Sequence, residues 1–114
     1  MSAIPDAGDL VWVNFSPQAG HEQAGRWPAL VLSPGAYHQK TALAIVCPIT
    51  SNTQPYPFKV VLPDGLPIGG AVLADQVKSI DRTARQLKIA GPAPRSVVAE
   101  VQAKIAALLG LDDA

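Results

Sequence analysis

Residues 20–28, with the sequence GHEQAGRWP, bring together four side chains that can take part in proton transfer or charge stabilisation. They are an imidazole, a carboxylate, an amide and a guanidinium, carried by His21, Glu22, Gln23 and Arg26. A carboxylate can accept a proton from an attacking hydroxyl, and a guanidinium can stabilise negative charge that develops at phosphorus. Glu22 and Arg26 could therefore flank one phosphate, although a simple surface ion pair between them is the structural alternative.

These residues lie between two apolar runs, 10–15 and 29–33, that each have the pattern of a β-strand. The connection from 16 to 27 has about twelve residues, and loops of this length are usually functional or disordered. Because it ends in Trp27-Pro28 directly before an apolar run, an ordered loop is the better interpretation. We expect this loop to hold its polar side chains at a working site.

Two further polar groups follow apolar runs later in the chain. Thr50 and Ser51 open a cluster of short hydroxyl and amide side chains after the run 42–47. Taken alone, such hydroxyls would cap the turn that follows the strand. Asp75 and Gln76 supply acceptor and donor groups, and taken alone they would be turn residues.

Two kinds of site are not expected in this sequence, a metal site and a cofactor site. His21, His38 and Cys47 do not have the spacing of metal ligands, so no metal site is expected. The chain also lacks a glycine-rich loop that would cradle a phosphate before a helix, and we expect no cofactor.

Composition predicts a single folded domain over residues 1–114, with 1–7 as a flexible leader. Hydrophobic residues make up 48% and charged residues only 16%, which excludes a disordered chain and weakly favours a dimer. The net charge of zero excludes a protein that coats nucleic acid without specificity. A basic segment, 78–95, in which Asp81 is the only acid, still allows a local basic face.

The expected location follows from the single cysteine and from the missing apolar segments. Cys47 stands alone in an apolar run, which is typical of a buried small hydrophobe in a reducing cytoplasm. No run reaches the ~18 apolar residues of a membrane helix, and the first residues lack a signal-peptide pattern. We therefore expect a soluble cytoplasmic protein that contacts no membrane.

The spacing of apolar residues predicts a mainly β, α+β fold with one C-terminal helix. A polar connection is expected over 37–40, and the segment GPAP over 91–94 should end the sheet and open the helix. Gly110 should cap that helix. The predicted strands are 10–15, 29–33, 42–47, 57–62, 71–74, 77–80 and 86–89. The apolar stripe predicted for the helix is Val97, Val98, Val101, Ile105, Leu108 and Leu109.

Five runs in order, GDLVWVNFSP, GHEQAGRWPALVLS, PIT, YPF and LADQVKSID, resemble the MazF/PemK family of bacterial toxins. The resemblance extends from about Gly8 to the end of the C-terminal helix. It implies an SH3-like small β-barrel, CcdB/PemK-like, that forms a homodimer and is neutralised by a cognate MazE-like antitoxin. It also implies a sequence-specific endoribonuclease, an mRNA interferase, that cleaves single-stranded RNA. The 2′-hydroxyl would attack without a metal, leaving a 2′,3′-cyclic phosphate and a 5′-hydroxyl.

The resemblance also assigns roles to residues of this chain. Glu22, Arg26 and Thr50 would be catalytic, with Thr50 contacting the scissile phosphate. The implied RNA-binding residues are Gln23, Trp27, Ser51, Asp75 and Gln76. His21 is not carried over, because that position of the motif is variable.

The chain departs from the family motif at two positions. An arginine usually stands directly before the proline and is the principal catalytic cation, but Trp27 occupies that place and Arg26 precedes it. Neighbouring residues of an extended segment face opposite ways, so either the loop twists to present Arg26 or cleavage is impaired. Trp27 could stack on a base, or equally belong to a core or dimer interface. Gln54 stands where close relatives carry a basic residue.

Two other functions remain open at this point. A toxin of the same fold that binds and poisons DNA gyrase would need no Glu-Gln followed by arginine in its loop. An SH3-like peptide-binding module would need an aromatic groove. Aromatic residues make up only 5% of this chain, which disfavours such a module.

Overall fold

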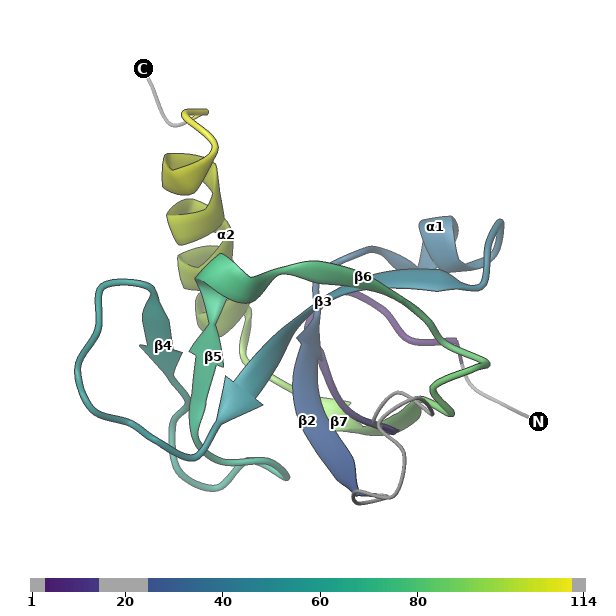
Figure 1. Ribbon diagram of the computed structural model, residues 1–114, viewed down its shortest axis with the longest axis horizontal. Helices are drawn as coiled ribbons and strands as arrows, with labels where there is room; N and C mark the ends of the chain where they lie inside the picture. Colours follow the sequence, from purple (N-terminus) through teal and green to yellow (C-terminus); the bar gives the residue numbers. More distant parts are fainter. Residues whose placement is uncertain (1–3, 15–24, 112–114) are drawn as a thin grey trace.

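The computed structural model describes residues 4–14 and 25–111, and it is a mainly antiparallel sheet with a C-terminal helix. Helix α2 packs beside β4 and the 3-10 turn η2 at one end of the sheet, and the short helix α1 lies at the other end (Figure 1). The elements are β1 Asp9–Asn14, β2 Arg26–Val31, α1 Gly35–His38, β3 Leu43–Thr50, β4 Lys59–Val61, β5 Ala71–Leu73, η2 Ala74–Gln76, β6 Lys78–Asp81, β7 Lys88–Pro92 and α2 Arg95–Leu108.

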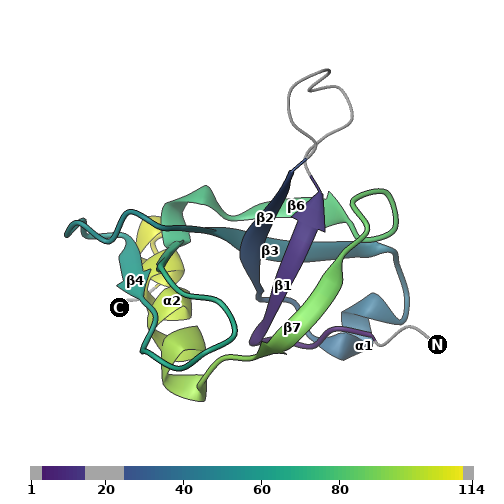
Figure 2. The ribbon, with the colours of Figure 1, turned by 90° about the horizontal axis from the view of Figure 1, so that it is seen from below.

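Strand β3 is the centre of the sheet, and its apolar run is typical of a strand buried on both faces. The strand order is β4-β5-β3-β2-β1-β7, with β6 paired to β3 outside this path. Strand β5 pairs with the end of β3 and β6 pairs with its beginning, where Leu43 lies opposite Asp81. Because β7 ends the order without joining β6, the described sheet is not closed (Figure 2). The predicted α+β class with a C-terminal helix is confirmed, and "SH3-like barrel" describes it loosely.

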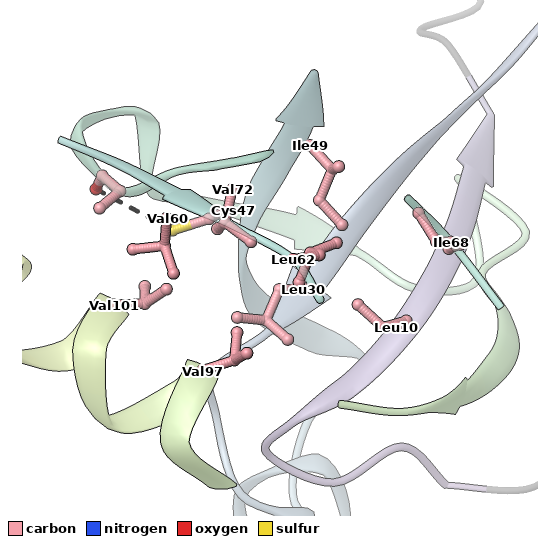
Figure 3. Close-up of a cluster of buried hydrophobic side chains, with 11 residues drawn as sticks. Leu10, Leu30, Cys47, Ile49, Val60, Leu62, Ile68, Val72, Val97 and Val101 are labelled. Atoms are coloured by element: carbon pink, nitrogen blue, oxygen red, sulfur yellow. Dashed lines mark hydrogen bonds between the residues drawn. The ribbon is translucent and has the colours of Figure 1, made fainter. Parts of the chain in front are cut away.

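Two clusters of buried side chains occupy the two faces of the sheet. The first, here called the helix-side cluster, packs Val97 and Val101 of α2 against the strands (Figure 3). Cys47 belongs to it as a buried free thiol, and burial raises its pKa to about 12. The strand and loop members of the helix-side cluster are Leu10, Leu30, Cys47, Ile49, Val60, Leu62, Ile68, Val72 and Ala74. The second, the far-side cluster, comprises Val11, Val13, Ala29, Val31, Ala44, Val46 and Ile80.

Of the leader predicted over 1–7, residues 4–7 are described, and they contact the rest of the fold. Pro5 is fully buried, and its carbonyl accepts a hydrogen bond of 2.7 Å from His38 Nδ1. The Asp6 carboxylate accepts the N–H of Gly35 at 2.7 Å, and this bond lowers the pKa of Asp6. Helix α1 overlaps the segment 37–40, for which a polar connection was predicted. Its last residue, His38, is buried, and the Nε2 atom of His38 is hydrogen-bonded to Ser33 Oγ at 2.7 Å. These contacts tie the N-terminal segment to the fold.

The C-terminal helix begins after Pro94 as predicted, but the preceding strand and the apolar stripe differ from expectation. Strand β7 runs through Gly91 and Pro92, because a register shift lets them pair with β1. Gly110 has φ +72° and donates to the carbonyl of Ala107, which confirms it as the helix cap. The predicted stripe is only partly buried, since Leu109 is 66% exposed.

None of the helices in the described ranges is long and apolar enough to cross a membrane.

Candidate functional site

The sequence suggested that Arg26 and Trp27 lie in a loop, but both belong to strand β2. They pair with Asn14 and Val13 of β1, and this pairing continues through Pro28 opposite Trp12. A proline removes only a donor, so the antiparallel ladder extends past it. The predicted loop is therefore shorter, and His21, Glu22 and Gln23 lie outside the described residues.

Strand alternation places the two neighbours on opposite faces of the sheet. Trp27 is half-buried and packs against the far-side cluster, the side taken by Ala29 and Val31. Arg26 is exposed and shares its face with Leu30 of the helix-side cluster. The guanidinium of Arg26 and the ring of Trp27 therefore lie on different faces of the sheet.

Thr50 ends β3 at the same end of the sheet where β2 begins (Figure 1). Counting alternate residues from Val46 places Thr50 on the face of the far-side cluster, together with Trp27. Its Oγ1 accepts the N–H of Asn52 at 3.1 Å, which leaves the hydroxyl proton for another acceptor. Ser51 follows as an exposed residue. A half-buried hydroxyl whose proton is taken by no residue of the described ranges is suited to donate to a phosphate oxygen.

Asp75 and Gln76 form part of η2 and are both exposed. This turn lies between β5 and β6, so it sits along the flank of β3 and is offset from Thr50. The Asp75 carboxylate accepts a hydrogen bond of 2.9 Å from the Tyr56 hydroxyl, and this bond raises the pKa of Tyr56. The structure thus brings Trp27, Thr50 and Ser51 to one end of the sheet, with Asp75 and Gln76 beside it.

Two lysines that the sequence did not single out lie near these residues. The Lys59 ammonium donates to the carbonyls of Asn52 and Gln54, at 2.8 and 3.1 Å, and holds the loop after Thr50. The Lys78 ammonium lies 5.2 Å from the centroid of the Trp27 ring. In the sequence, Lys78 stands in the basic segment 78–95 and in the run LADQVKSID, but neither assigned it a role.

Gly70 is a further residue that sequence reasoning missed. It has φ +119°, and a Cβ there would come within 2.3 Å of the Thr50 carbonyl oxygen. A residue without a side chain is therefore required where the loop before β5 crosses Thr50. No group of metal-binding side chains occurs in the part of the chain that the structure describes.

Comparison with known proteins identifies the family. The family model for the PemK-like, MazF-like toxin of type II toxin–antitoxin systems matches residues 6–109. The chain belongs to this family. Endoribonuclease toxin MazF of Escherichia coli K12 is 46% identical over 107 residues, covering 94% of this chain and 96% of that protein. Endoribonuclease PemK of E. coli is 35% identical over 91% of this chain and 81% of its own length.

Solved structures of MazF/PemK proteins agree with this assignment. A crystal structure of MazE–MazF from Deinococcus radiodurans superposes with a TM-score of 0.92 at 52% identity, covering 97% of this chain and 100% of that one. The chain is an endoribonuclease toxin of the MazF/PemK family, as the sequence runs predicted. The alternative of a gyrase poison is not favoured.

Proposed function

We propose that this endoribonuclease toxin cleaves single-stranded mRNA at a short recognition sequence by attack of the 2′-hydroxyl, without a metal. The observation that carries the proposal is the Thr50 hydroxyl, which is half-buried at the sheet end and keeps a proton to donate. In this reaction the 2′-oxygen forms a bond to phosphorus while the bond to the 5′-oxygen breaks. A donor placed at the phosphate stabilises the charge of that transition state.

The other candidate residues divide between cleavage and recognition. Glu22 is proposed as the base that accepts the 2′-hydroxyl proton, on the basis of the family motif. Arg26 is exposed at the start of β2 and is proposed as a contact to the RNA backbone. The residues proposed to read or bind the RNA are Gln23, Trp27, Ser51, Asp75 and Gln76.

The test is cleavage of a long RNA by the purified protein in EDTA, followed by mapping of the fragment ends. We expect cuts at one short motif, with 2′,3′-cyclic phosphate and 5′-hydroxyl ends. Heat-inactivated protein serves as the control for contaminating nuclease. An absence of cuts, cuts without sequence preference, or a requirement for added metal would contradict the proposal.

We also propose that a MazE-like antitoxin inhibits this chain in the cytoplasm, where its mRNA substrate is found. The support is the relative from D. radiodurans, whose structure is of MazE–MazF. An acidic, partly disordered antitoxin segment would mimic RNA and order itself over the site. The short acidic protein expected from the neighbouring gene should abolish cleavage in the same assay when added in equimolar amount. Undiminished cleavage would contradict this proposal.

A homodimer is proposed as the working form, with the RNA groove at or beside the subunit interface. An apolar groove of about 390 Å³ lies between α2 and strand β3, and exposed Leu109 and Val77 border it. Burying such a surface against a second copy would remove apolar area from water. The groove is lined by Leu32, Ile45, Val77, Gln102, Ile105, Ala106, Leu109 and Leu111.

Leu109→Asp is expected to convert the dimer to a monomer, because it places a charge in this groove. Sedimentation velocity at micromolar concentration should give the dimer mass for the parent and the monomer mass for the variant. Val61→Asp is the matched control, since Val61 is 57% exposed on β4 and does not line the groove. A parent that sediments as a monomer would contradict the homodimer, and a dimeric Leu109→Asp would place the interface elsewhere.

A further inference from the structure

Lys78 and Trp27 form a contact between strands that the catalytic assignments do not use. Lys78 begins β6, is exposed, and is paired through the backbone with Val46 of β3. Its ammonium lies 5.2 Å from the centroid of the Trp27 ring. Over residues 4–14 and 25–111, no hydrogen bond or ion pair engages this ammonium. An aromatic face attracts a cation without using its N–H groups, so the contact with Trp27 leaves the donors of Lys78 unused.

Lys78 lies on the same face of the sheet as Thr50. Ile80, two residues after Lys78, belongs to the far-side cluster, as does Val46 in the strand that ends at Thr50. Because side chains alternate along a strand, Lys78 and Thr50 both project toward this face. Trp27 packs against the same cluster from β2, whereas Arg26 projects to the other face.

We infer that Lys78 is a catalytic residue, whose ammonium contacts a nonbridging oxygen of the scissile phosphate that Thr50 also binds. This inference rests on the proposed function. The family arginine would extend from the position of Trp27, and here the Lys78 ammonium is held over the ring that replaces it. A cation from β6, on the other side of β3, thus lies in the region where the missing guanidinium would be.

The role of Lys78 is electrostatic, and it exchanges no proton in the reaction. The 2′-hydroxyl loses its proton to the base, and its oxygen bonds to phosphorus as the bond from phosphorus to the 5′-oxygen breaks. The departing 5′-oxygen takes its proton from water. Negative charge on the phosphate oxygens grows along this path, so a fixed ammonium binds the transition state more tightly than the substrate. The loss of Lys78 should therefore lower the rate constant at saturating RNA and not only the affinity.

The experiment compares single-turnover cleavage of a short RNA that contains the mapped site, at saturating enzyme. We expect Lys78→Gln to lower the rate constant about 100-fold. Lys78→Arg should recover most of it, because the charge is kept. Lys88→Gln is the matched control: Lys88 is exposed on β7, pairs with Trp12, and lies on the opposite face. That control should stay within about twofold of the parent in rate constant.

Two additional variants test whether Lys78 or Arg26 supplies the catalytic cation. Arg26→Ala tests the cation that the resemblance assigned as catalytic: if Lys78 has that role, this variant should lower the RNA affinity and reduce the rate constant less than Lys78→Gln does. Trp27→Arg combined with Lys78→Gln restores a cation from the family position and should recover at least tenfold over Lys78→Gln alone. Unfolding midpoints of all variants show whether any loss of rate is a loss of fold.

The inference is overturned if Lys78→Gln cleaves at the parent rate at saturating enzyme, or if it matches Lys88→Gln in every readout. It is also overturned if Arg26→Ala shows the 100-fold loss instead. In each of these cases the parent still cleaves RNA, so the proposed function stands. A parent that fails to cleave would remove both together.

Discussion

Gly70→Ala is expected to lower the free energy of unfolding by about 2–4 kcal/mol and to reduce cleavage as well. The added Cβ would lie 2.3 Å from the Thr50 carbonyl oxygen, at a backbone φ of +119° that side chains rarely adopt. Because the obstacle is backbone, the strand end that carries Thr50 must shift to relieve it. Urea denaturation measures the stability change, and single-turnover cleavage measures the displacement of the site.

Gly69→Ala is the matched control for this prediction. A Cβ at Gly69 meets no atom within 4 Å, so its stability should stay within about 0.5 kcal/mol of the parent. If both alanine variants are equally stable, the loop before β5 does not press on Thr50 as the structure indicates. If Gly70→Ala unfolds more easily but cleaves normally, Thr50 tolerates the shift and its position is not critical.

Thr50→Val is expected to reduce the cleavage rate constant about 10²–10³-fold, because it removes one donor at the phosphate while keeping the shape of the side chain. The same change removes the acceptor of the Asn52 N–H, which costs about 0.5–1.5 kcal/mol of stability. Thr50→Ser keeps the hydroxyl and should retain most of the activity. Rates are compared by single-turnover cleavage, below the temperature at which any variant begins to unfold.

Thr53→Val serves as the control for this second prediction. Thr53 is exposed in the same loop, so its replacement should leave the cleavage rate within about twofold of the parent. A loss of less than about threefold in Thr50→Val would mean that the hydroxyl only caps the turn. In that case Thr50→Val would still be less stable than the parent, but Thr50 would not be a catalytic residue.

Local patterns in the sequence determined most of the secondary structure of this toxin. The alternating run near residue 11 became β1, the apolar run over 42–47 became the core of central β3, and Gly110 became the helix cap. These features follow from side-chain alternation and from backbone preferences, which act within a few residues. The ordered runs shared with the MazF/PemK family also fixed the enzyme class without any coordinates.

The tertiary structure decided which residues meet, because those contacts depend on strand register and sheet curvature. Pro5 and His38 are joined by a hydrogen bond between distant segments, so no local pattern revealed that the leader is held. The extension of β2 through Pro28 put Trp27 and Arg26 on opposite faces, which sequence spacing left open. Lys78 reaches Trp27 only because β3 separates and aligns their two strands. Sequence thus supplied the candidate groups, while long-range pairing set the face of the sheet on which each one can act.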